Sequence, residues 1–289
     1  MAESPAHKFG QIIGNVLEDA IEPRLRQFAE QHNLYLDRKG YRPAREGTKV
    51  TWEDKFGNRH DLDYVFERGG TPERIGTPVA FIESAWRRYT KHSRNKAQEI
   101  QGAILPLLDT YRNAAPFIGV VLAGVFTEGA LNQLQSRGFS ILYFPYETVV
   151  KAFQKIGIDA SSEEETPESE FEEKVRAWEG LRDNQCSQAA RWLVRLNSKE
   201  VNKFMQSLER AITRKIELIR VLPLYGTSIE LNSVQEAITF IENHDENRGS
   251  NTLARYEVEI RFNNGDHIRG YFADKRNATD FLRPFLPSE

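Results

Sequence analysis

The first 160 residues alternate between helical and strand-like spacings of hydrophobic positions. Apolar residues recur every three or four positions over 8–32, which predicts an amphipathic helix that Pro23 kinks or divides. The continuous apolar run at 117–126 is typical of a strand covered on both faces. Further expected elements are strands at 79–86 and 139–146 and helices at 95–112, 127–138 and 147–159. This alternation predicts an α/β layer.

A hairpin with its turn at 54–58 comes before this layer. On its return strand, 60–66, Asp61 and Asp63 are expected on one face, because alternate residues of a strand point the same way. Acidic residues are poor strand formers. Two of them on one face indicate either an exposed sheet surface or a cation site, and we favour the cation site.

The strand at 79–86 has an apolar run that ends at Glu83. A carboxylate there is costly to bury unless a divalent metal or a paired cation compensates its charge. The stretch 84–98 then contains aromatic residues and cations but no acid. Its cations are Arg87, Arg88, Lys91, Arg94 and Lys96. Such a patch attracts phosphate groups, although a solvated approach to a helix has the same composition.

The character of the chain changes at 160–174, which is acidic and serine-rich and therefore predicts a linker. We place a domain boundary there, between residues 1–160 and 161–289. The later expected elements are a mainly helical stretch at 171–220, a helix at 231–244, a β-hairpin at 255–273 and a short helix at 274–285. This C-terminal region could recognise a target, form a dimer interface or cap the fold.

Composition limits the classes of function. The chain has 289 residues and a formal charge of −3, so a nucleic-acid surface would have to be a local patch. The single Cys186 excludes an intramolecular disulfide and a zinc site built from cysteines. No apolar run approaches the roughly 18 residues of a membrane span, and the N-terminus lacks a signal pattern. We expect a soluble cytoplasmic protein.

Asp63 and Glu83 are the strongest candidates for chemistry, because they are expected on adjacent strands. Mg²⁺ or Mn²⁺ prefers oxygen ligands, and Mg²⁺ is often held by one or two carboxylates together with water and phosphate. Such an ion can activate water and neutralise charge during phosphodiester hydrolysis. Glu18 and Asp61 are candidate additional ligands. The sequence has no P-loop, nucleophile elbow, HExxH or glycine-rich dinucleotide turn that would favour another chemistry.

Residues 8–160 resemble the PD-(D/E)XK nuclease superfamily, the fold of many type II restriction endonucleases. The resemblance rests on a helix carrying Glu18, a hairpin ending in Asp63, and a strand bearing Glu83-Ser84-Ala85, followed by a helix and a strand. It implies a restriction-endonuclease-like mixed sheet flanked by helices. It also implies Mg²⁺-dependent cleavage of double-stranded DNA, as by a restriction enzyme, with Asp63 and Glu83 as metal ligands. A homodimer follows by analogy, because cutting both strands needs two active sites.

The sequence departs from this family at Ala85, where the pattern has a lysine that orients or activates the attacking water. Three explanations remain open. Ala85 could be an inactivating substitution, the cation could have moved to Lys91 or Lys96, or the protein could be a DNA-binding relative that does not cleave. A repair or recombination nuclease that selects DNA structure is a further alternative.

Overall fold

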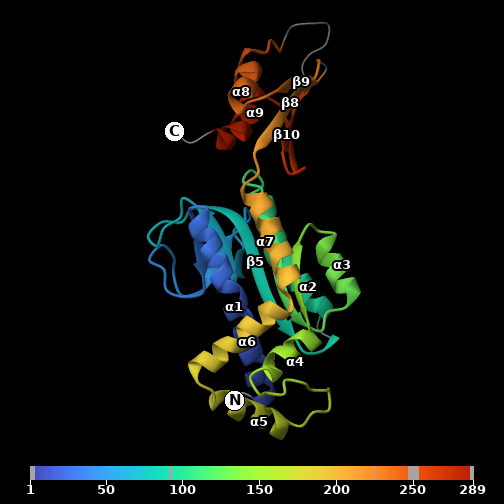
Figure 1. Ribbon diagram of the computed structural model, residues 1–289. Helices are drawn as coiled ribbons and strands as arrows, with labels where there is room; N and C mark the ends of the chain where they lie inside the picture. Colours follow the sequence, from blue (N-terminus) through green and yellow to red (C-terminus); the bar gives the residue numbers. More distant parts are fainter. Residues whose placement is uncertain (1–3, 91–92, 225, 247–253, 287–289) are drawn as a thin grey trace. The chain divides into compact units, whose positions relative to one another are not determined.

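The computed structural model describes residues 4–90, 93–224, 226–246 and 254–286. The chain divides into two compact units (Figure 1). Unit 1 comprises Met1–Tyr111 and Pro116–Leu208, and unit 2 comprises Arg112–Ala115 and Glu209–Glu289.

Unit 1 is built on a five-stranded sheet in the order β1-β4-β5-β6-β7. The strands are β1 (Leu34–Arg38), β4 (Tyr64–Arg68), β5 (Thr77–Arg87), β6 (Phe117–Gly124) and β7 (Ser140–Pro145). The pairings β1–β4 and β4–β5 are antiparallel, whereas β5–β6 and β6–β7 are parallel. The prediction of an α/β fold with a mixed sheet is therefore confirmed. The apolar runs account for it, since β5 and β6 are buried along most of their length.

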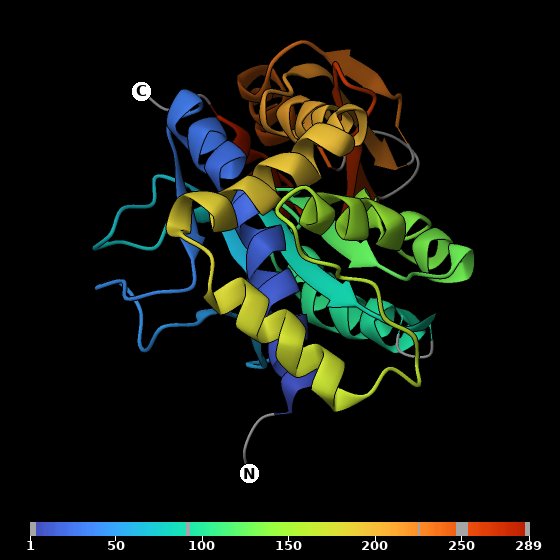
Figure 2. The same ribbon diagram turned by 60° about the horizontal axis from the view of Figure 1, so that its bottom comes forward.

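Helices cover both faces of this sheet (Figure 2). On one face, α2 (Ser93–Thr110) and α3 (Glu128–Gln135) share an apolar core with Val65, Phe81 and Val120. On the other face lie α1 (Pro5–Gln31) and α4 (Tyr146–Gln154), joined by an edge-to-face contact between Phe9 and Phe153. Helix α1 continues through Pro23 and is not divided there.

The expected hairpin forms a separate two-stranded sheet of β2 (Val50–Glu53) and β3 (Arg59–Leu62). Its turn is closed by a hydrogen bond from the backbone N–H of Asp54 to the carbonyl of Asn58. Gly57 in the turn has a φ of 83°, a conformation that glycine adopts without steric cost.

We expected the chain to divide at residue 160. The two units divide near residue 208 instead. The helices α5 (Glu168–Glu179), α6 (Asp183–Leu196) and α7 (Ser198–Ile212) follow the acidic segment. Both α5 and α6 pack against α1, for example through Phe171 and Phe9 at 6.4 Å between ring centroids. The acidic segment is therefore a surface connection within unit 1, because the helices after it bury their apolar faces in the same core.

Unit 2 contains a four-stranded antiparallel sheet in the order β11-β10-β8-β9, with helices on one face. Its elements are β8 (Ile216–Leu224), β9 (Ile229–Leu231), α8 (Val234–Asn243), β10 (Arg255–Phe262), β11 (His267–Phe272), α9 (Lys275–Leu282) and a 3₁₀ turn at Arg283–Phe285. The predicted hairpin at 255–273 and the predicted helix at 231–244 are confirmed. The mainly helical stretch expected to reach residue 220 ends earlier, because β8 begins at Ile216.

Candidate functional site

Asp63 and Glu83 meet where the chain passes from the small sheet into the large one. Tyr64 pairs with Ile82, which brings the residues on either side of that pair together. The backbone N–H of Asp63 donates a hydrogen bond to Oε1 of Glu83 at 3.1 Å. The backbone N–H and the hydroxyl of Ser84 donate to Oδ2 of Asp63 at 2.7 and 2.9 Å. Ser84 on β5 therefore fixes the carboxyl group of Asp63, and the backbone of Asp63 fixes that of Glu83.

The Glu83 carboxyl is buried, and its electrostatic surroundings are unfavourable to a negative charge. Burial first and the neighbouring Asp63 second raise the pKa of Glu83 to about 8, while the positive charge of Lys96 acts in the opposite direction. A carboxyl in such a position stays protonated at neutral pH unless a cation compensates it.

Glu18, on α1, belongs to the same electrostatic cluster. Burial, followed by the charge of Asp63, raises the pKa of the Glu18 carboxyl. Within the described ranges, no three His, Cys, Asp or Glu side chains are close enough to hold a metal by themselves. Glu18 therefore lies near the Asp63–Glu83 pair, and its direct contact with a metal ion stays a prediction.

The donor atoms at this pair fit a hard divalent cation. Two carboxylates are sufficient for Mg²⁺, whose remaining ligands are commonly water and phosphate oxygens. No described residue donates a hydrogen bond to Oδ1 of Asp63 or to Oε2 of Glu83. The raised pKa of Glu83 is also consistent with a site that a cation would stabilise.

Asp61 does not join these carboxylates, contrary to the prediction that it shares a face with Asp63. Its carboxylate accepts hydrogen bonds from Lys49 Nζ and Thr51 Oγ1, both at 2.6 Å, on the exposed side of the small sheet. The chain leaves β3 after Leu62 and enters β4 at Tyr64, so the strand is interrupted at Asp63. The two-residue alternation is lost at that interruption.

A cleft of about 480 Å³ opens next to the Asp63–Glu83 pair, and it is lined by their neighbours Glu18 and Ser84 but not by Asp63 or Glu83. Its walls come from α1, from β5 and from Lys96 on α2. Ala85 lines this cleft and also contributes to the apolar core beneath it. Two lysines could take the role of the one missing at Ala85. Of these, Lys96 lies within the described residues, and its charge lowers the pKa of Glu83. Lys91, the other candidate, lies outside the described residues.

The expected phosphate contacts have different environments. Arg87 and Lys96 line the cleft and both approach the carboxylate of Glu99, at 3.8 and 3.5 Å. Arg88 also lines it, but its guanidinium donates to the carbonyl of Ala6 at 2.8 Å and lies over Phe171. Arg88 therefore anchors the start of α1 in addition to adding positive charge. Arg94 is exposed on α2.

Sequence reasoning identified Glu18 on α1 but missed the glycines of α1 and Ser84 as parts of this site. Gly10, Gly14 and Glu18 recur every four residues, and all three line the cleft. This spacing puts them on one face of a helix and could have been recognised in the sequence. The hydrogen bonds from Ser84 to Asp63 have no such signal, because they depend on the register between strands.

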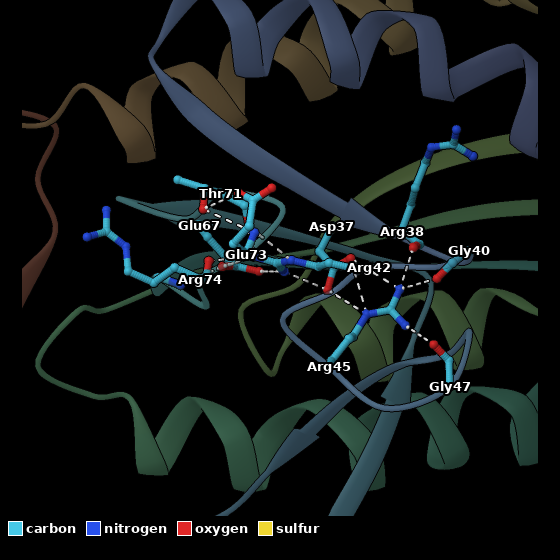
Figure 3. A network of polar contacts seen from close by, with 11 residues as sticks. Asp37, Arg38, Gly40, Arg42, Arg45, Gly47, Glu67, Thr71, Glu73 and Arg74 are labelled. Carbon is cyan, nitrogen blue, oxygen red and sulfur yellow. Dashed lines mark hydrogen bonds and ion pairs between the residues drawn. The ribbon is translucent and has the colours of Figure 1, made fainter.

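A second charged cluster has the features of a structural network (Figure 3). The side chains of Arg42, Asp37 and Glu67 are almost completely buried. Arg42 donates to both carboxylate oxygens of Glu67, at 2.5 and 3.0 Å, and lies 2.9 Å from Asp37. It also donates to the carbonyls of Thr71 and Arg74. This network ties two loops to strands β1 and β4.

Comparisons with known proteins give little functional information. No family model and no curated protein matches the chain. It is similar to one solved structure, titled "Crystal Structure of Protein of Unknown Function AF1548", at 12% identity and a TM-score of 0.29. The match covers 68% of this chain and 97% of that chain. Among the described residues, no helix has the length and apolar character needed to span a membrane.

Proposed function

We propose that this protein is a Mg²⁺- or Mn²⁺-dependent endonuclease of the PD-(D/E)XK type that cleaves double-stranded DNA, as a restriction enzyme does. We further propose that it acts in the cytoplasm as a homodimer, since cutting both strands of a duplex needs two active sites. The single observation that carries the proposal is the contact between Asp63 and Glu83 beside a cleft lined with cations.

The residues have distinct roles in this proposal. Asp63 and Glu83 would hold the cation, which when bound would polarise the phosphate and lower the pKa of a water molecule. Ser84 orients the Asp63 carboxylate through two hydrogen bonds. Lys96 replaces the lysine missing at Ala85, because it lines the same cleft and acts electrostatically on Glu83. Arg87 adds positive charge for the DNA backbone.

One observation favours a second candidate, a DNA-binding relative that does not cleave. Ala85 carries no group that could orient water, and its methyl group packs in the apolar core. In this alternative, the cations along the cleft bind phosphate, and the carboxylates keep their positions without supporting hydrolysis.

The test is cleavage of mixed-sequence duplex DNA in Mg²⁺ or Mn²⁺. We expect the unchanged chain to cut, and both Asp63→Asn and Lys96→Ala to lose at least about 100-fold in rate. The matched control is Lys199→Ala, which removes an exposed lysine from α7 and should leave the rate unchanged.

Two other outcomes separate the alternatives. Cutting only after Ala85→Lys, and its loss when Asp63→Asn is added, would mark Ala85 as the site of the missing lysine and overturn the role of Lys96. If no variant cuts although the chain binds DNA in a salt-dependent way, the second candidate replaces the nuclease.

A further inference from the structure

The sheet of unit 2 has one face covered by helices and one open face. Helices α8 and α9 pack on the side formed by residues such as Ile219, Val258 and Ile260. Among the described residues of this unit, no helix packs against the other side. The proposed cleavage chemistry uses no residue of this unit, so the open face needs a separate account.

A row of charged residues crosses the open face from strand to strand. Arg220 on β8 pairs with Glu259 on β10, and Glu259 pairs with Arg269 on β11. Oε1 of Glu259 accepts hydrogen bonds from Arg261 Nε at 2.9 Å and from Arg269 Nη2 at 3.2 Å. Arg220 Nη1 lies 3.5 Å from Oε2 of Glu259. One carboxylate therefore orients two guanidinium groups and lies near a third, and that third group, Arg220, donates to Oε1 of Glu230 on β9 at 2.6 Å.

The charges on this face form two layers. The side chain of Glu259 is only 11% exposed, whereas those of Arg261 and Arg269 are 43% and 54% exposed. Arg255 and Glu257 repeat this arrangement at 49% and 28% exposure. Over β10 and β11 the carboxylates therefore lie underneath and the guanidinium groups outermost, so this part of the face presents positive charge to solvent. At the β9 edge the order is reversed, because Glu230 is 55% exposed and its partner Arg220 is 35% exposed.

An aromatic side chain completes this surface. Tyr271 on β11 is exposed and pairs with Glu257, which places it on the same face as the arginines. The guanidinium of Arg255 lies 5.2 Å from the centre of the Tyr271 ring. An exposed tyrosine next to fixed arginines can contact sugars and phosphates together.

We propose that this arginine face, defined by Arg220, Arg255, Arg261, Arg269 and Tyr271, binds the phosphate backbone of duplex DNA. A guanidinium has five N–H donors, so a group held by one carboxylate keeps others for phosphate oxygens. Because Glu259 already holds Arg261 and Arg269 through hydrogen bonds, little of their side-chain entropy is lost on binding. The choice of DNA rests on the proposed function, and the surface would hold the substrate without taking part in catalysis.

The experiment measures binding of a short fluorescent duplex of mixed sequence to the full chain in EDTA, so that no cleavage occurs. We expect Arg261→Ala/Arg269→Ala to weaken binding about 10-fold or more and to reduce the salt slope by nearly 2, at about 0.9 for each lost phosphate contact. Arg261→Lys/Arg269→Lys, which keeps the charge without the guanidinium fork, should bind with intermediate affinity.

The matched control is Lys275→Ala/Arg276→Ala, which removes the same charge from α9 on the helix-covered side of the sheet. It should bind as the unchanged chain does. Equal losses in both double variants would indicate general electrostatics and overturn the arginine face, as would unchanged binding in both. Thermal melting must show that each variant is folded. If Arg261→Ala/Arg269→Ala does not fold, the affinity of Arg261→Lys/Arg269→Lys decides the outcome.

The arginine face and the proposed cleavage site can fail separately. If no form of the chain cuts but Arg261→Ala/Arg269→Ala selectively weakens binding, the nuclease proposal fails and the arginine face stands. If cutting depends on Asp63 while both double variants bind equally well, the arginine face fails and the nuclease stands.

Discussion

The backbone N–H of Asp63 points at the carboxyl group of Glu83, 3.1 Å from Oε1, twenty residues later in the chain. The contact joins the residue that comes just before β4 to a residue of its antiparallel partner β5. It keeps two acidic side chains adjacent even though their charges repel and burial disfavours the charge of Glu83.

Stability in EDTA should fall as the pH rises, because of Glu83. The folded chain holds this proton up to a pKa of about 8, whereas the unfolded chain releases it near 4.5. The favourable contribution is complete below pH 4.5 and is lost as the pH rises through 8, by up to about 5 kcal/mol. Glu83→Gln, which stays neutral, should flatten this dependence in melting curves recorded across that range.

The control for this measurement is Glu99→Gln, which changes an exposed acid on α2 and should keep the slope of the unchanged chain. A Glu83→Gln variant with the same slope as the unchanged chain would show that Glu83 is ionised in the folded protein at neutral pH.

Ser84→Ala should weaken cation binding without unfolding the chain. The substitution removes the hydroxyl donor to Asp63 Oδ2 and keeps the backbone donor. Loss of such an orienting partner typically reduces metal affinity about 10- to 100-fold. Titration calorimetry with Mn²⁺ would measure it, with Ser136→Ala, at an exposed helix end, as the comparison. Equal Mn²⁺ affinities would remove Ser84 from the site.

Arg42→Met should be strongly destabilising, because it leaves Asp37 and Glu67 buried without their shared cation. Removing one partner of a buried ion pair costs about 3–5 kcal/mol. The control is Arg38→Met, which removes a half-exposed partner of Glu22 and should cost about 1 kcal/mol or less. Urea denaturation compares the two, and similar midpoints would contradict the structural role of the network.

Gly124→Ala should destabilise the end of β6 by at least about 2 kcal/mol. Gly124 has a φ of 96°, and an added Cβ would lie 2.1 Å from the carbonyl oxygen of Arg87. Gly129→Ala, within α3, meets no atom within 4 Å and should stabilise the chain by up to about 1 kcal/mol. Thermal melting should therefore shift in opposite directions for the two variants.

Long apolar runs made the large sheet predictable. The expected strands at 79–86 and 117–126 correspond to Thr77–Arg87 and Phe117–Gly124, because a buried strand needs apolar residues on both faces. The start of β8 was predicted as helix, because its alternating charged and apolar residues directly follow a stretch rich in helix-forming residues. The boundary at 160 was misplaced because composition reports solvent exposure, and an acidic surface loop resembles a linker.

The candidate site was predictable only in part. The order of the strands was sufficient to bring Asp63 and Glu83 together, because consecutive antiparallel strands pair. The separation of Asp61 from them depends on a single-residue interruption between β3 and β4 that leaves no mark in the hydrophobic pattern. Arg42 was overlooked for a similar reason, since a buried arginine in a loop has the same sequence signature as a solvated one.

β5 supplies Glu83, Ser84, Ala85 and Arg87 from one unbroken strand paired on both sides. Any single-residue insertion or deletion between Val79 and Glu83 would move every later side chain on this strand to the opposite face of the sheet. Natural length variation should therefore be confined to the loops at 39–49 and 69–76 and absent from β5. Homologues should therefore keep the length of this strand, which would change only by substitution.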